Sequence, residues 1–154
     1  MSVILLIVGL FFQPQDTSPE QVAFDSFIRN QLESYADHGS MFFSGITEPK
    51  ANLSGPFHDC FPSDEQFNEF FHKEKPRSVD QKEIEFTETK RLKKSSKSKK
   101  NKLNLEVYGA VYDREVAYVH LVVYEPSSFA DHYLFKLSLS KSNVIETCKR
   151  SEMM

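Results

Sequence analysis

Four polar rings on predicted strands are the candidates for chemistry in this chain of 154 residues: Tyr118, His120, Tyr124 and Tyr133. Inside an apolar cavity, a histidine can act as a general base and a tyrosine hydroxyl can stabilise a developing oxyanion. No Asp–His or Glu–Tyr pair in the sequence has the spacing of a catalytic motif. His120 therefore fits a core position better than a catalytic one, and we assign no catalytic residue.

The face of the sheet on which His120 lies depends on a predicted hairpin. Residues 112–115 are typical of a tight turn centred on residues 113–114. Pairing about that turn places Val107 opposite His120 and Gly109 opposite Tyr118, so His120 would join the apolar face of its neighbour strand. The alternate positions of the same strand are equally apolar and leave the other assignment open: Ala117, Val119, Leu121 and Val123.

Metal and cofactor sites are not indicated by the remaining reactive residues. His58 and Cys60 form one short pair, whereas zinc requires three or four convergent ligands. The other histidines (His38, His72, His120 and His132) are scattered over separate elements. The sequence also contains no glycine-rich phosphate loop and no G-x-S-x-G or H-E-x-x-H motif. We therefore predict no metal and no cofactor.

Two cysteines and one sequon bear on the cellular compartment. Cys60 and Cys148 permit one disulfide, and two free buried thiols are the alternative. Asn52 begins an Asn-Leu-Ser acceptor sequon for N-glycosylation, inside a loop rich in proline and glycine. Both features are typical of a secreted protein.

The first residues also favour secretion. Val3–Phe12 is an apolar run with the length of a signal-peptide core, and it is too short to span a bilayer. No basic residue precedes it and no clear cleavage site follows, so a buried N-terminal strand is the alternative. We interpret residues 1–17 as a leader and predict a secreted protein with no transmembrane segment. A nuclear or cytoplasmic location follows if residues 1–17 are not a leader.

A basic segment stands out against an acidic body. Residues 90–102 hold eight Lys/Arg and no acid, whereas the rest of the chain holds 11 Lys/Arg against 22 Asp/Glu. Residues 93–101 consist of Lys and Ser up to Asn101, and we predict a flexible hairpin loop there. Because no aromatic ring interrupts the lysines, contact with a polyanion would rest on charge alone. The residues predicted to make that contact are Lys93, Lys94, Lys97, Lys99 and Lys100.

The periodicity changes from helical to alternating along the chain. Ser18 is predicted to cap a helix of about 20 residues that ends at Gly39, with Gln21 as its capping-box partner. Ser63 is predicted to cap a second helix, with Gln66 as box partner and an apolar face of three phenylalanines. Strands are predicted at 41–46, 82–92, 102–112, 115–124, 131–140 and 143–148, with residues 47–62 as loop and 149–154 as a tail.

This order predicts one α+β domain over residues 18–148. Two or three helices would cover a curved antiparallel sheet of four to six strands. The order of elements, with the segment from His58 to Ser63 running into Gln66–Phe71, resembles the nuclear transport factor 2-like superfamily of cone-shaped folds. That resemblance implies a concave sheet face able to hold a small apolar molecule. It does not choose among the isomerases, dehydratases, adaptors and non-catalytic domains of the superfamily.

The function favoured by these observations is a small extracellular binding or interaction domain that is not an enzyme. Its partner would be a small apolar ligand or another protein, with weak polyanion contact through the basic loop and a homodimer through the sheet as a further option. One alternative is an isomerase or dehydratase that uses the cone cavity. Another is an intracellular or nuclear domain that uses the basic loop.

Overall fold

A computed structural model describes residues 17–51, 53 and 56–154. Residues 1–16 of the predicted leader (1–17) and the sequon residue Asn52 lie outside the described residues. The elements in chain order are α1 (Pro19–Asn30), η1 (Leu32–His38), β1 (Met41–Phe43), β2 (Lys50–Ala51), α2 (Glu65–Lys73), β3 (Arg77–Ser78), β4 (Leu92–Lys94), β5 (Leu103–Val107), β6 (Val111–Asp113), β7 (Val116–Glu125), β8 (Phe129–Ser138) and β9 (Asn143–Met153).

The predicted α+β class is confirmed, although the sheet is larger and more mixed than expected. Within the described residues, a seven-stranded sheet has the order β4-β1-β5-β7-β8-β9, with β6 also paired to β7, and β2 and β3 form a separate small sheet. From β5 onward the pairing is antiparallel, but β1 lies between β4 and β5 and is parallel to both. The alternation of apolar and polar residues shows which side chains share a face of a strand, but it does not show which strands pair. The position of β1 between β4 and β5 was therefore not predicted.

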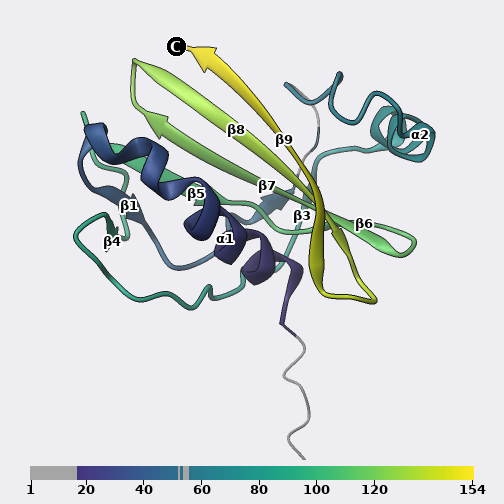
Figure 1. Cartoon of the computed structure of the whole chain (residues 1–154), viewed down its shortest axis with the longest axis horizontal. Helices are drawn as coiled ribbons and strands as arrows, with labels where there is room; N and C mark the ends of the chain where they lie inside the picture. The colour runs from purple at the N-terminus through teal and green to yellow at the C-terminus, as the bar shows by residue number, and fades with distance from the viewer. Residues whose placement is uncertain (1–16, 52, 54–55) are drawn as a thin grey trace, which may run out of the picture.

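The two faces of the sheet carry separate cores. Helix α1 lies across one face (Figure 1) and packs Phe24 and Phe27 against alternate residues of β5, β7 and β8. The other face holds a second cluster around Tyr118, covered by α2 and the segment that precedes it. Strand β7 therefore contributes to both cores, which explains why its residues are apolar on both sides.

Helix α1 begins as predicted and ends earlier. The Ser18 side chain accepts a hydrogen bond from the backbone N–H of Gln21, as an N-cap does. The predicted capping box is wrong, because the Gln21 side chain instead exchanges two hydrogen bonds with the backbone of Glu85 (2.8 and 2.9 Å). The α-helix ends at Asn30, and a 3₁₀ helix continues to Gly39, whose φ of +83° suits a glycine stop.

The predicted strand at 82–92 is mostly absent. Only Leu92–Lys94 forms a strand there, and Glu83 makes one isolated bridge to Ile46. The bonds from Gln21 hold this stretch against α1, so its alternation reflects contact with a helix and not a place within the sheet.

Helix α2 is capped one residue later than predicted. Asp64, rather than Ser63, accepts the backbone N–H of Phe67 (3.0 Å), and Gln66 donates to Asp113 instead of reaching back to the cap. The predicted apolar face is present, with Phe67 fully buried against Tyr118.

The predicted register of the β5–β7 pair is wrong by one residue. Val107 lies opposite Leu121, not His120, and the hairpin turn falls at residues 114–115, where Arg114 has φ of +55°. A shift of one residue moves each side chain to the other face of the sheet, so His120 lies on the face away from α1. The predicted pairing of Gly109 with Tyr118 is also wrong, because Tyr118 pairs with Val111.

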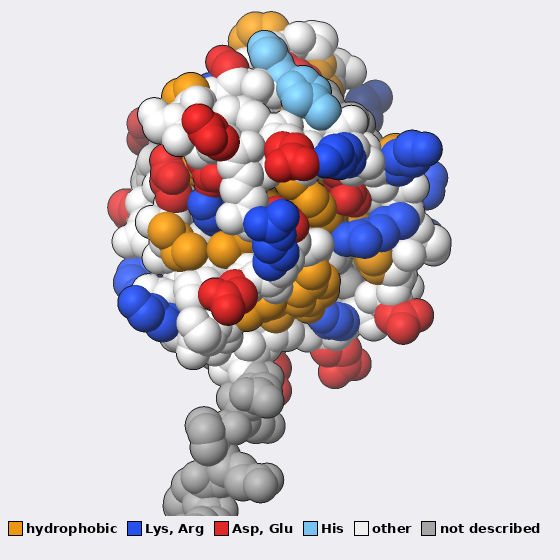
Figure 2. Space-filling model, turned by 90° about the vertical axis from the view of Figure 1, so that its right-hand side faces the viewer, with side chains coloured by type: hydrophobic (Ala, Val, Ile, Leu, Met, Phe, Trp, Pro, Cys, Tyr) orange, Lys and Arg blue, Asp and Glu red, His pale blue; other side chains and the backbone are white. Residues whose placement is uncertain are grey.

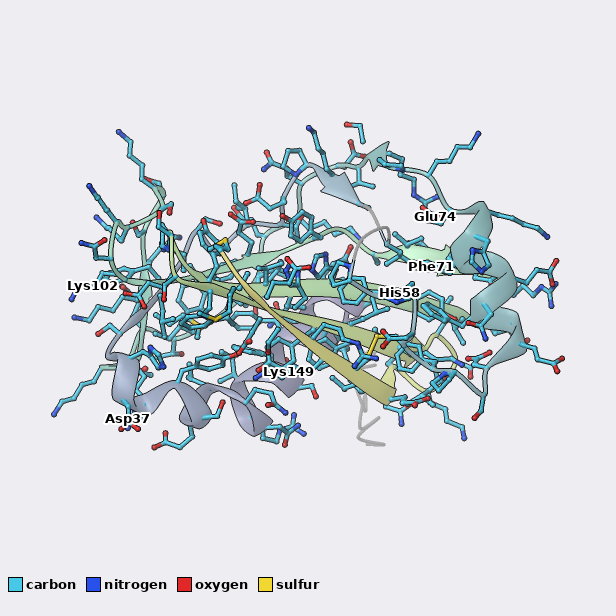
Figure 3. All side chains as sticks on the ribbon, turned by 90° about the horizontal axis from the view of Figure 1, so that it is seen from above. Asp37, His58, Phe71, Glu74, Lys102 and Lys149 are labelled. Atoms are coloured by element: carbon cyan, nitrogen blue, oxygen red, sulfur yellow. A yellow bond between two sulfur atoms is a disulfide. The ribbon has the colours of Figure 1, made fainter. Side chains whose placement is uncertain are left out.

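The basic segment is not a hairpin loop. Strands β4 and β5 both pair in parallel with β1 and not with each other, so residues 95–102 pass over β1 on one face of the sheet to reach the start of β5. Lys93 and Lys94 lie in the edge strand β4, whereas Lys99 lies over the Phe42 ring of β1. Figure 3 shows Lys102 at the end of the molecule opposite to α2.

Candidate functional site

Three of the four predicted ring candidates, Tyr118, His120 and Tyr133, do not converge. Tyr118 and His120 lie on the face covered by α2, whereas Tyr133 lies in the core beneath α1. Tyr118 is fully buried among phenylalanines, and its hydroxyl has no hydrogen-bond partner among the described residues. A shared catalytic cavity that contains all three is therefore not formed.

His120 is one half of a histidine pair. Its Nε2 lies 3.1 Å from Nδ1 of His132, and its ring is stacked on Tyr108 and meets the edge of Phe57. Burial, with a smaller contribution from His132, lowers the pKa of His120 to about 3. The ring is therefore neutral at physiological pH, and the aromatic rings of Tyr108 and Phe57 lie against it.

A polar network that was not predicted surrounds the hydroxyl group of Tyr133. The Tyr35 hydroxyl donates to Asp131 Oδ2 (2.5 Å) and lies 2.6 Å from the Tyr133 hydroxyl. Ser151 donates to Asp131 Oδ1 (2.6 Å), and the Lys149 ammonium lies 2.8 Å from Oδ2 and above both tyrosine rings. We name these five residues the Asp131 network.

The contacts within the Asp131 network keep the Asp131 carboxylate ionised and the Tyr35 hydroxyl protonated. Burial alone would raise the pKa of Asp131, but the bonds from Lys149, Ser151 and Tyr35 outweigh it and lower the pKa. Burial and the bonds to Asp131 and Tyr133 raise the pKa of Tyr35 far above its usual value. The carboxylate stays ionised and saturated with donors, so the arrangement can bind and orient but offers no free base.

A pocket of about 340 Å³ opens beside this network. Tyr35, Asp131 and Lys149 form its polar wall, and His38 and Phe129, whose rings meet edge to face, form an aromatic wall. A hollow of this size could hold a small molecule against charged and aromatic side chains.

A second hollow, of about 260 Å³, lies between the start of α1 and the β8–β9 connection. Pro19, Val22, Tyr112 and Leu139 line it, and none of its lining residues is charged. Figure 2 shows hydrophobic side chains gathered on this side of the molecule, with acidic and basic side chains interspersed around them. The hollow offers apolar contact but no group for acid–base chemistry.

The exposed lysines beside β4 form the third candidate. We name Lys93, Lys94, Lys97, Lys99 and Lys100 the basic rim, because all five are exposed and lie in β4 or in the connection that follows it. Salt bridges that neutralise them are absent from the described part of the chain.

One buried side chain shapes the backbone of the basic rim. Asn104 is 3% exposed, and its amide oxygen accepts the N–H of Lys99 (2.6 Å). Its amide nitrogen donates to the carbonyls of Lys99 (3.0 Å) and Lys102 (2.8 Å). The Tyr124 hydroxyl adds a contact to Ser98 (3.3 Å) from the neighbouring strand. The connection between β4 and β5 therefore has a defined backbone, in contrast to the flexible loop that the sequence suggested.

A carboxylate pair lies beneath the same connection. Glu106 accepts hydrogen bonds from the hydroxyls of Tyr108 and Tyr124 (both 2.9 Å). Burial, and then the charge of Glu106, raise the pKa of Glu48. The Glu106 carboxylate is therefore bonded to tyrosines and not to the lysines. The exposed carboxylate of Glu88 accepts the backbone N–H of Lys94 (2.7 Å), so one acid lies beside the rim.

The cysteines are joined. Cys60 and Cys148 form a disulfide with a Cα–Cα distance of 5.8 Å, which ties the segment before α2 to β9. Among the described residues, no three His, Cys, Asp or Glu side chains are grouped as metal ligands.

Two parts of these sites were missed from the sequence but left a signal in it. Asp131 alternates with Tyr133 and Phe135 on one face of β8, so a charged residue at a core-facing position marked the network. Asn104 likewise interrupts an apolar strand directly after the lysines. The signal at Asp131 was a charged residue at a position predicted to be buried, and the signal at Asn104 was an amide between two leucines of a short strand.

Comparisons with models of protein families, with characterised proteins and with solved structures found no match. Membership of the nuclear transport factor 2-like superfamily therefore stays a prediction. In the described part of the chain, no helix has the length and apolar character needed to cross a membrane.

Proposed function

We propose that the protein is a secreted binding domain that contacts sulfated polyanions through the basic rim. The observation that carries this proposal is the set of three hydrogen bonds between the buried Asn104 side chain and the backbone of Lys99 and Lys102. A fixed backbone lowers the entropy lost when several lysines engage one polymer.

The extracellular location is supported by several observations together. The Cys60–Cys148 disulfide is compatible with an oxidising compartment, where such bonds persist. The predicted leader and the Asn52 sequon agree with it. In that compartment the polyanions that remain are sulfated glycans rather than nucleic acids.

The expected contact is local and depends on charge. The body of the protein is acidic outside residues 90–102, so a long polyanion is attracted at the rim and repelled elsewhere. No aromatic side chain interrupts the lysines of the rim, so binding should weaken steeply as salt screens the charges.

Heparin affinity chromatography tests this proposal. The variant K97Q/K99Q/K100Q should elute at clearly lower salt than the unmodified protein. The control K50Q/K75Q/K141Q removes the same charge from exposed lysines elsewhere and should elute with the unmodified protein. Equal effects of both triple variants would show that net charge, and not the rim, determines retention.

The location requires a separate test, because the rim could bind other polyanions inside a cell. The full-length chain with a C-terminal tag should appear in the medium of a secreting cell line, and mass spectrometry should find a mature N-terminus near residue 18. A nuclear protein that still begins at Met1 or Ser2 would refute secretion and favour the nuclear alternative.

A further inference from the structure

Strand β9 gives the sheet a long free edge. It spans Asn143–Met153, and within the described residues it pairs only with β8. A free edge presents unpaired backbone groups that another strand can satisfy. Figure 1 shows β9 at the outside of the sheet, away from the β4 edge that carries the basic rim.

The hydrogen-bond pattern between β8 and β9 identifies the β9 residues whose backbone groups point away from β8. Met154 donates its N–H to Ser128, which is on the inner side of the strand. In an antiparallel ladder the hydrogen-bonded positions alternate, and the register is regular from Glu146 onward. The inward positions are therefore even-numbered, and Thr147, Lys149 and Ser151 present their N–H and carbonyl groups outward.

We propose that β9 pairs antiparallel with β9 of a second copy of this chain, about a two-fold axis at Cys148. Because only odd-numbered residues face outward, a two-fold axis must pass through a residue rather than between two. In the register centred on Cys148, Thr147 of one copy exchanges two backbone hydrogen bonds with Lys149 of the other. The same register places Glu146 opposite Arg150, twice in each dimer.

Charge selects this register over its neighbours. If the axis passed through Glu146, Lys149 or Arg150, that charged residue would lie opposite the same residue of the second copy, and the two like charges would repel. An axis at Thr147 would place Glu146 opposite Cys148 and leave both charges without an opposite partner. Among axes from Glu146 to Arg150, the register at Cys148 is the one that joins opposite charges. An axis at Ser151 would also pair Arg150 with Glu152, but it would use only residues 149–153 of β9, whereas the axis at Cys148 uses the whole strand.

The residues concerned are available for this contact. Glu146 and Thr147 are exposed, and Glu146 forms no salt bridge in the described part of the chain. Arg150 already bonds to Asp59 (2.8 Å) on the face that Glu146 shares. One guanidinium nitrogen of Arg150 donates to the carbonyl of Lys149, which has a second lone pair for a partner strand.

A charge-exchange experiment on the full-length mature protein tests the proposal by sedimentation velocity. The unmodified protein should be a dimer. E146R and R150E should each raise the dimer dissociation constant about tenfold or more, because both cross-strand pairs become repulsive. An equimolar mixture of the two variants restores every pair between unlike copies and should form the dimer again.

A backbone variant provides an independent readout. T147P removes an outward N–H and leaves the bonds to β8 in place, so it should yield a folded monomer, whereas T147A should remain a dimer. The proposal is overturned if the unmodified protein is a monomer, if it forms assemblies larger than a dimer, or if the mixture of E146R and R150E stays monomeric.

Discussion

The histidine pair makes the fold sensitive to mild acid. His120 and His132 share one hydrogen bond between ring nitrogens, in which one nitrogen donates and the other accepts (3.1 Å). Full protonation of both rings would leave no acceptor between them and would place two positive charges side by side. Among the neighbouring groups, Tyr108 and Phe57 offer uncharged rings, and Glu152 lies 3.5 Å from the outer nitrogen of His132.

The pKa of His120 gives the size and sign of the effect. Burial lowers this pKa from 6.5 to about 3, whereas the unfolded chain keeps the ordinary value. Between these values the unfolded state binds more protons, so the free energy of unfolding falls as the pH falls. From pH 7 to pH 4.5 the expected loss is about 2–3 kcal/mol.

The variant His120→Phe should remove most of this dependence, because a phenyl ring can keep the contacts with Tyr108 and Phe57 but does not titrate. The assay is urea unfolding followed by far-UV circular dichroism between pH 7 and pH 4.5. Asp64 and Asp131 have lowered pKa values and should destabilise the fold only at more acidic pH. The control is His72→Phe, at an exposed histidine on α2.

The slope of stability against pH decides the outcome, whatever the absolute stability of each variant. A shallow slope for His120→Phe beside an unchanged slope for His72→Phe would support the reasoning. Parallel slopes for His120→Phe and the unmodified protein would refute it, because the acid sensitivity would then arise elsewhere.

Three further variants test the packing. Phe67→Ala should lower the free energy of unfolding by about 3–5 kcal/mol, because the ring is fully buried, and a loss under about 0.5 kcal/mol in urea titration would contradict the second core. Replacing Cys60 and Cys148 together with Ser should cost about 4–5 kcal/mol, since the bond closes a separation of 88 residues, and an unchanged thermal midpoint would argue against that. Gly109→Ala should cost about 1–3 kcal/mol, because a Cβ there would lie 2.5 Å from Val79, and Val79→Ala in the same chain should recover most of the loss.

The elements that the sequence predicted well are those in which periodicity alone decides the structure. The apolar face that includes Phe67 requires only helical spacing, and β8 requires only alternation. The Cys60–Cys148 bond was open to prediction because the chain has two cysteines and hence one pairing.

The features that were missed depend on which strands meet and at which residue. Strand β7 is apolar on both faces, so its pattern could not place His120, and the turn geometry at Arg114 decided the register instead. The insertion of β1 between β4 and β5 joins segments distant in sequence, and no local pattern reports such a contact. The basic segment was therefore misread as a hairpin.

The two proposals concern opposite edges of one sheet, and this arrangement links them. The basic rim follows β4 and the proposed dimer contact is β9, which are the two ends of the strand order. Pairing through β9 would continue the sheet across two copies and carry a basic rim at each outer end. A polymer long enough to reach both rims would then bind with avidity, because its second contact is intramolecular. E146R leaves every lysine of the rim in place and adds positive charge, yet it should weaken binding to a long heparin chain. It should not weaken binding to a heparin fragment too short to bridge the rims.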